Sequence, residues 1–412
     1  MTKHDALCII NAVFIIYSQK IHGVITLSMN CNNQLCLTRL NKGEPIIQAD
    51  PDSWDSRFTL NPTALYLERS PHNDELIKGL LDKHSIDDPL LENGVVVIFY
   101  RGIPIDVPGL PSCRSAVGLS VFTPDLHFIK KFDHPVLKPS DDPMEYDYNG
   151  VEDQRITRIG DTFYLLYCGF VTYPNGDYKV QVCMAVSEDL ISWQKLGPVK
   201  GDVNVWPNKD AVLLPEPVDG HYIMMHRPCA GKQSDFSISL AISDSPTGVW
   251  KDCGMIMKAV QHPLYIESWV GMGSTPINLG NNIYLADYHT GNYLASGARD
   301  YFANYALLDF NKFDIAHPEK IVEWRTEAIL FPETDYEVES PWPHEQRLNC
   351  VFPCGSYEYK GDIYLIYGGA DAYVLAARLN KEELLHHNEE LLSSDSRHVW
   401  AADYLREFYT RS

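Results

Sequence analysis

The sequence predicts an all-β fold, a five-bladed β-propeller with a short C-terminal helix. Short hydrophobic runs, most of them ending in an aromatic side chain, recur along the chain at a spacing of roughly 60 to 90 residues. The runs are residues 95–100, 163–167, 222–225, 283–288 and 363–367. A second apolar run follows each of them, and a segment with a polar start precedes it, which indicates units of three or four antiparallel strands. Radial repetition of such units is typical of a propeller.

The ends of the chain differ from this repeat. Residues 6–17 form an apolar stretch with the length of a signal-peptide core, too short to span a bilayer. Its flanks are poor for a signal, so residues 1–28 are an N-terminal extension that is either signal-like or an upstream start, with Met29 the functional start. Residues 29–380 are the predicted propeller domain. Residues 381–412 are a helical tail, with Asn380 as its N-cap and Glu383 in its first turn. Residues 72–83 predict a short helix inserted in the first blade.

Composition and charge exclude several classes of protein. The 412 residues are 45% hydrophobic and 22% charged, which excludes disordered, collagen-like and coiled-coil chains. There are 34 Lys and Arg against 55 Asp and Glu, a formal net charge of -21. Such a field repels phosphate backbones and anionic lipids, so we expect neither nucleic acid nor membrane as a partner.

The 10 cysteines indicate a reducing compartment. They contain no CxxC pair, and Cys168 and Cys183 lie within apolar runs, where a free thiol packs as a small hydrophobic group. We therefore expect a cytoplasmic protein without a metal site, although the apolar N-terminal stretch leaves secretion or a periplasmic location open.

In a propeller, the polar corners of the repeated units meet at one mouth of the central channel. The first strands of the units contribute Asn61, Glu152, Asp153, Arg155, Lys209, Asp210, Ser274, Thr275 and the 353–355 turn. The ends of the second strands contribute Arg101, His226, Arg227, Tyr288, His289 and Asp371. Carboxylates, cations, His and Tyr around a channel match the needs of a sugar, which takes many hydrogen bonds and one acid.

Glu152 and Asp153 are the sharpest candidates for chemistry. Adjacent side chains on a strand project to opposite faces, so we expect only one of the two carboxylates to point into the channel, with Arg155 on the face of Asp153. Each candidate also has a plain structural interpretation. The Glu152 group would be an ion pair at a blade corner, Lys209 and Asp210 a solvated turn, and Tyr288 core packing. Their shared phase in the repeat favours the functional interpretation.

These motifs also resemble a known family. They are 151–156, 208–211, 226–228, 271–277, 288–289, and 351–355 with 369–371. In this order they resemble the motifs of glycoside hydrolase family 130, whose members are β-mannoside phosphorylases and related β-mannosidases on a five-bladed propeller. The resemblance spans roughly residues 40–380.

The resemblance implies an inverting enzyme that cleaves a β-mannoside oligosaccharide with inorganic phosphate and releases mannose 1-phosphate. Asp153 would be the general acid, and no cofactor beyond the phosphate co-substrate is implied. The residues implied to bind the sugar are Asn61, Arg101, Glu152, Arg155, Asp210, His226, Tyr288 and Asp371. Those implied on the phosphate side are Lys209, Arg227 and His289.

The chain departs from the family pattern in three places. Gln154 replaces a proline, residues 168–172 lack a basic side chain that phosphorylases tend to carry, and residues 337–347 are longer and more charged. Hydrolysis therefore stays open as an alternative. It needs a second carboxylate about 6.5–9.5 Å from the acid as a base, and Glu267 and Glu345 are the candidates.

The sequence leaves two further questions open. A non-catalytic, sugar-binding propeller is the alternative to an enzyme. Residues 72–94 and 337–347 are unusual enough to shape either an acceptor subsite or a contact between subunits of a homo-oligomer. For an acid that is protonated near neutral pH, we expect burial or the Glu152 charge to raise the pKa of Asp153 above its usual value near ~3.9.

Overall fold

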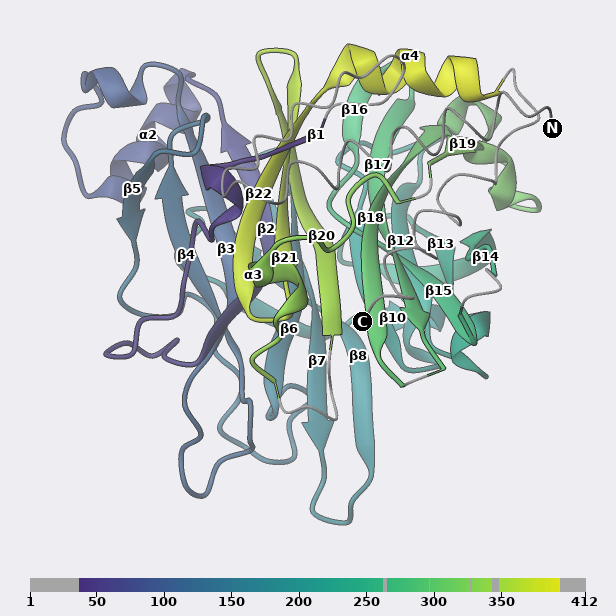
Figure 1. The fold of residues 1–412 in the computed structure, drawn as a ribbon, viewed down its shortest axis with the longest axis horizontal. Coiled ribbons are helices and arrows are strands. Elements are labelled where there is room, and N and C mark those ends of the chain that lie inside the picture. The colour runs from purple at the N-terminus through teal and green to yellow at the C-terminus, as the bar shows by residue number, and fades with distance from the viewer. Residues whose placement is uncertain (1–36, 262–264, 296, 327, 343–347, 393–412) are drawn as a thin grey trace, which may run out of the picture. The chain divides into compact units, whose positions relative to one another are not determined.

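The computed structural model describes residues 37–261, 265–295, 297–326, 328–342 and 348–392, and the side chains up to residue 386. The predicted extension 1–28 and most of the predicted tail lie outside these ranges. Strands dominate the described chain (Figure 1), which confirms the all-β class. Within these ranges, none of the helices combines the length and apolar character that a bilayer crossing would require.

The strands between residues 58 and 198 form two four-stranded antiparallel sheets. The first sheet contains, in order, β2 (Phe58–Leu67), β3 (Val95–Ile103), β4 (Ala116–Phe122) and β5 (Phe128–Lys131). The second contains β6 (Gly150–Ile159), β7 (Thr162–Thr172), β8 (Tyr178–Ser187) and β9 (Gln194–Pro198). Each strand pairs with the next along the chain, because a chain with short connections folds back on itself most readily as a meander.

A third sheet has the same antiparallel core and one added strand. It consists of β11 (Asn208–Leu213), β12 (Tyr222–Pro228), β13 (Ser237–Ser243) and β14 (Val249–Lys258). The short β10 (Lys200–Gly201) pairs in parallel with the outer strand β14. In all three sheets, the strand that comes first in the antiparallel series lies at one edge of the sheet.

The nine-stranded sheet contains two antiparallel units. One unit has β15 (Glu267–Met272), β16 (Ile277–Gly280), β17 (Ile283–Tyr293), β18 (Arg299–Asp309) and β19 (Val322–Arg325). The other has β20 (Leu348–Tyr359), β21 (Asp362–Gly369), β22 (Tyr373–Asn380) and, from the other end of the described chain, β1 (Leu37–Arg39). A short parallel pairing of β18 with β20 joins the two units.

The helices are few and short. The 3-10 turns are η1 (Asn41–Gly43), η2 (Pro89–Leu91), η3 (Asp202–Asn204), η4 (Gln233–Asp235), η5 (Phe310–Lys312) and η6 (Pro318–Ile321), and α3 (Asp335–Val338) is one turn of α-helix. The predicted helix in the first unit is α2 (Pro71–Leu81), which starts after the N-cap Ser70. The predicted C-terminal helix is α4 (Lys381–Leu392), where the Glu383 amide donates to Asn380 Oδ1 at 3.1 Å, so the predicted cap is confirmed.

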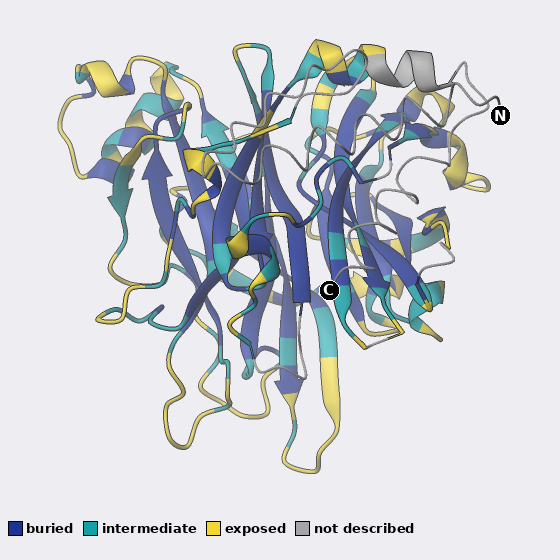
Figure 2. Ribbon diagram, viewed as in Figure 1, coloured by how far each residue is buried: buried dark blue, intermediate teal, exposed yellow. Residues whose placement is uncertain are grey.

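The core lies between neighbouring sheets. Figure 2 shows buried strands and exposed loops, as expected when each sheet is covered on both faces. Phe99 and Leu119 of the first sheet, for example, belong to the same apolar cluster as Leu165 and Tyr167 of the second. Because the sheets pack face to face, residues at equivalent strand ends of different sheets are brought to one region.

Three units share a buried polar contact, which we call the acid–tyrosine latch. A carboxylate from the segment before the first strand accepts from a tyrosine on the second strand and pairs with a cation on the outer strand. The latches are Asp55 with Tyr100 and Lys131, Asp147 with Tyr167 and Lys195, and Glu337 with Tyr367 and Arg39. The three tyrosines end three of the five hydrophobic runs of the sequence, so in these units the aromatic end of the run is part of a latch.

Loss of one latch is expected to destabilise the fold. In Asp147→Asn, Lys195 would lose the carboxylate that lies 2.5 Å away. Breaking a buried ion pair costs about 3–5 kcal/mol, and Lys195 is partly exposed, so we expect urea unfolding to show a loss of about 2–3 kcal/mol. Asp141→Asn, in the exposed pair with Arg114, is the matched control and should leave the unfolding midpoint nearly unchanged. Equal effects of the two variants would contradict the latch.

Candidate functional site

A repeated backbone irregularity aims three side chains at the site. Asn61, Asp153 and Asp210 have φ of 44°, 52° and 56°, the left-handed region that Asn and Asp tolerate better than other non-glycine residues. Each lies where the register of the first strand shifts by an extra residue. Such a bulge turns a side chain out of the regular alternation, so strands from three sheets each direct one polar group to the same place.

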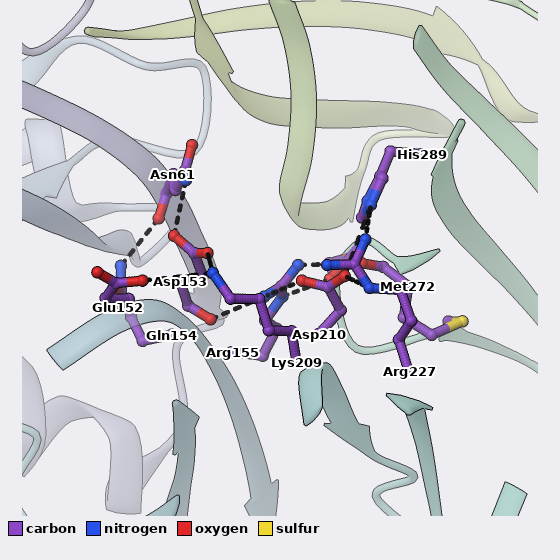
Figure 3. A network of polar contacts seen from close by, with 12 residues as sticks. Asn61, Glu152, Asp153, Gln154, Arg155, Lys209, Asp210, Arg227, Met272 and His289 are labelled. Atoms are coloured by element: carbon purple, nitrogen blue, oxygen red, sulfur yellow. Dashed lines mark hydrogen bonds and ion pairs between the residues drawn. The ribbon is translucent and has the colours of Figure 1, made fainter. Parts of the chain in front are cut away.

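Asp153 lies where these strands meet (Figure 3). Its carboxylate accepts a hydrogen bond from Asn61 Nδ2 at 2.7 Å and lies 3.3 Å from Arg101 Nη1. Lys209 Nζ lies 3.8 Å from the second carboxylate oxygen. Only 6% of the residue is exposed, so Asp153 is a buried carboxylate held by cations rather than a surface charge.

The bulge also corrects the expectation for Glu152. The prediction that only one of the two adjacent carboxylates faces the site is wrong. Glu152 Oε1 pairs with Arg101 Nη2 at 2.7 Å, and its Oε2 lies 3.4 Å from Lys209 Nζ. Both carboxylates therefore share the same two cations, because the register shift after Glu152 breaks the strand alternation on which the prediction rested.

The pKa of Asp153 lies well below its usual value. Burial raises this pKa, but the charges of Lys209, Arg101 and Arg155, with the hydrogen bond from Asn61, lower it by more. The expected upward shift is therefore wrong for the protein by itself, because the sequence does not reveal how many cations gather here. Donation of a proton by Asp153 requires a bound group that offsets these cations.

Arg155 is occupied by protein groups. Its Nε donates to the carbonyl of Gly273 at 3.0 Å, its Nη2 to the carbonyl of Met272 at 3.0 Å, and its Nη1 to the carbonyl of Asp153 at 2.7 Å. Its Nη1 also lies 3.2 Å from Asp210. This geometry favours a positioning role, in which the guanidinium holds the backbone of the bulge, over direct contact with a sugar.

Asp210, Arg227 and His289 form a second part of the network (Figure 3). Asp210 Oδ2 lies 3.0 Å from Arg227 Nε and 3.5 Å from His289 Nε2, and Arg227 Nη1 lies 3.3 Å from the same imidazole nitrogen. Burial lowers the pKa of His289 to about 3, together with the charges of Arg227 and Arg155 and against that of Asp210. His289 is therefore a neutral imidazole at neutral pH. A side chain at Gly271 would place its Cβ 2.3 Å from Asp210, so this approach requires glycine.

His226 and Tyr288 point away from this network. His226 Nδ1 lies 2.8 Å from Asn208 and its Nε2 3.7 Å from Asp252, while the Tyr288 hydroxyl donates to the carbonyl of Thr326 at 2.6 Å. Each precedes a network residue on the same strand, and strand alternation sends the two neighbours to opposite faces. The contacts favour scaffold roles for both, while their predicted sugar contacts stay predictions.

The remaining predicted residues divide between the site and its surroundings. The charges of Arg101, Asp153 and Glu152 act on Asp371, whose pKa is raised by burial and lowered in part by Arg101. Glu267 begins β15 opposite Tyr293, without a hydrogen bond or ion pair to Asp153. Glu345 lies outside the described residues. The ring centroid of Tyr301 lies 5.8 Å from that of His289, and Arg299 lies two residues before Tyr301 on β18. Neither residue belongs to a motif of the sequence, so the sequence did not indicate them.

Buried carboxylates held by cations and an amide donor at converging strand ends define the kind of site that carbohydrate-active enzymes use. The family model for Glyco_hydro_130, beta-1,4-mannooligosaccharide phosphorylase, matches residues 113–390. The chain therefore belongs to glycoside hydrolase family 130. It is 31% identical to a 1,2-beta-oligomannan phosphorylase from Thermoanaerobacter sp. (strain X514) over 72% of this chain and 89% of that protein.

Two solved structures share the fold. Beta-1,2-mannobiose phosphorylase from Listeria innocua, in complex with beta-1,2-mannobiose, has a TM-score of 0.62 at 20% identity and covers 88% of this chain and 99% of its own. A second structure has a TM-score of 0.60 at 19% identity and covers 87% of this chain and 96% of its own. Its description states that the GH130 family contains glycoside hydrolases that target beta-1,2 mannosidic linkages in Candida mannan.

Proposed function

We propose that this protein is an inverting β-mannoside phosphorylase that acts on β-1,2-linked mannooligosaccharides. The observation that carries the proposal is the placement of Asp153 beside Asn61, Arg101 and Lys209, in a chain 31% identical to a 1,2-beta-oligomannan phosphorylase. An inverting phosphorolysis needs one acid and a group of cations, and this site offers both. The sugar substrate agrees with the names of its relatives.

The same proposal covers the architecture. The five antiparallel units would be the blades of a propeller, with β1 completing the last blade beside β22. Network residues come directly after the aromatic or His residue of a second strand in three units, as Arg101, Arg227 and His289. A ring of blades would account for this equal placement, because each blade would present the same strand end to one channel.

In the proposed reaction, Asp153 supplies the proton that the glycosidic oxygen takes up as its bond to C1 of the mannosyl unit breaks. Phosphate attacks C1 from the opposite face and forms the new C–O bond, which yields mannose 1-phosphate with inverted configuration. The phosphate dianion is itself a nucleophile, so no protein base is required to deprotonate it. Arg227 and Lys209 would orient it.

Hydrolysis is the second candidate, and one residue favours it. Cys168 occupies, on β7, the place that Arg101, Arg227 and His289 occupy on their strands, and it brings no positive charge. A hydrolase would need a base such as Glu267 or Glu345 on the far side of the sugar.

One assay distinguishes phosphorolysis from hydrolysis. We expect release of product from β-1,2-mannobiose to require inorganic phosphate and to yield mannose 1-phosphate. Release of free mannose at the same rate without phosphate would reject phosphorolysis and select the hydrolase. Tight binding of the disaccharide without either product would select the sugar-binding protein.

We propose a reducing, cytoplasmic location and no cofactor, with inorganic phosphate as the co-substrate. The location is supported by the described cysteines, which are all free thiols: Cys113, Cys168, Cys183, Cys229, Cys253, Cys350 and Cys354. Burial raises the pKa of Cys168, Cys350 and Cys354, so these thiols stay protonated and unreactive beside the site.

A further inference from the structure

The first residues of β18 pair with a strand of the next antiparallel unit. β18 pairs with β17 and β19 of its own unit, yet its first residues also pair in parallel with β20 of the next unit, with Arg299 beside Leu348 and Tyr301 beside Cys350. On its other side, Tyr301 lies opposite Gly291 of β17. His289 is two residues from Gly291, so strand alternation places Arg299, Tyr301 and His289 on one face of the sheet.

The ring of Tyr301 is held by aromatic neighbours. Its centroid lies 5.8 Å from that of His289, 5.7 Å from that of Phe352 and 5.6 Å from that of Trp269. Burial raises the pKa of Tyr301, and the charges of Arg299 and Arg227 lower it only in part. The hydroxyl therefore remains a hydrogen-bond donor near two guanidinium groups.

Arg299 differs from the other cations of the site. Arg101, Arg155, Lys209 and Arg227 each have a carboxylate partner within 4 Å. In the part of the chain that the structure describes, neither a hydrogen bond nor an ion pair engages the Arg299 guanidinium. Its charge does act on Asp371, which links it to the Asp153 side of the network. The N–H groups of Arg299 are therefore available to a bound anion, whereas the neighbouring cations already pair with carboxylates.

We propose that Arg299 and Tyr301, together with Arg227, bind the attacking phosphate, so that β18 supplies the cation that β7 lacks at Cys168. The inference rests on the proposed phosphorolysis. A guanidinium offers two parallel N–H groups to a phosphate, and the tyrosine hydroxyl adds a third donor from a fixed ring. These groups hold and orient the phosphate, while the proton transfer stays with Asp153.

Kinetics with inorganic phosphate as the varied substrate test this site. In Arg299→Ala we expect the KM for phosphate to rise about 10- to 100-fold, because a charge-assisted hydrogen-bonded contact is lost, with the KM for β-1,2-mannobiose unchanged. Arg299→Lys should restore part of the loss, since the charge remains without the paired donors. Tyr301→Phe should raise the phosphate KM about 3- to 10-fold. Arg378→Ala, in a surface pair with Asp362, is the control and should behave as wild type.

The outcomes separate this inference from the proposed function. If wild type requires phosphate and Arg299→Ala has a wild-type phosphate KM, the inference is overturned and phosphorolysis stands. If wild type instead hydrolyses mannobiose without phosphate, the proposed function fails. In that case, the rise in Tm that inorganic phosphate causes tests whether Arg299 binds an anion. A rise in wild type that Arg299→Ala loses supports anion binding here, whereas an equal rise in both, or none in wild type, overturns it.

Discussion

Asp153→Asn is expected to lower kcat by about 10³-fold, with the fold and the affinity for β-1,2-mannobiose retained. Removal of a general acid costs about 10²- to 10⁴-fold, and Asp153 is the only acid that the proposed reaction uses. Asparagine keeps the shape of the side chain and accepts the left-handed backbone of the bulge, where φ is 52°. Steady-state kinetics of phosphorolysis measure the loss. Asp219→Asn, at an exposed turn with φ of 49°, is the matched control and should keep wild-type activity.

The same variant tests how Asp153 obtains its proton. Lys209, Arg101 and Arg155 keep the pKa of Asp153 well below its usual value, so the free protein holds it ionised at neutral pH. Bound phosphate adds negative charge beside these cations and should raise that pKa. Phosphate binding would then take up a proton, and its affinity would increase as the pH falls. Calorimetry in two buffers of different ionisation enthalpy should detect the uptake in wild type and its loss in Asp153→Asn.

Two results would contradict this assignment. Turnover by Asp153→Asn within a few-fold of wild type would mean that another group donates the proton. Asp371 would be the first alternative, because burial raises its pKa and it lies within the influence of the same charges. Proton uptake that persists in Asp153→Asn would likewise move the coupling to a different group.

The sequence predicts the all-β class and the individual strands well, because both arise from local patterns. Hydrophobic runs predict strands, and Asn380 with Glu383 predicts the start of α4, where the cap is observed. Asn61, Asp153 and Asp210 occupy equivalent first-strand positions, and their residue types already suit a left-handed bulge. Because Asn and Asp tolerate the left-handed region, their presence at three equivalent positions is a signal from which the bulge can be predicted.

The features that the sequence could not predict depend on strand register and on pairing between strands of separate units. Tyr288 and His289 are adjacent, and only the observed register determines that His289 faces Asp210. Arg299 lies beside Leu348 through the parallel pairing of β18 and β20, a contact between separate units that no local pattern encodes. The pKa of Asp153 is a sum over several charges, so its direction requires their positions.

Arg155→Lys is expected to lower both stability and kcat. The buried guanidinium of Arg155 bonds to the backbone of the Asp153 bulge, to the carbonyls of residues 272–273 and to the Asp210 carboxylate. Lysine cannot reach the carbonyls of Asp153, Met272 and Gly273 and also pair with Asp210. Unpaired buried carbonyls and the loss of one of the two guanidinium partners of Asp210 should lower the free energy of unfolding by about 3–5 kcal/mol. The kcat should fall about 100-fold through misplacement of Asp153, with a smaller change in KM.

Arg158→Lys is the matched control for this prediction. Arg158 lies three residues further along β6 and is partly exposed, with bonds to Asn73 and to the carbonyl of Gly160, so lysine there should preserve stability and activity. The ratio of kcat to KM effects separates the two roles of Arg155. A large rise in KM with kcat intact would mean that Arg155 contacts the sugar directly. A loss of stability with wild-type kinetics would mean that the bulge holds Asp153 in place without its guanidinium partner.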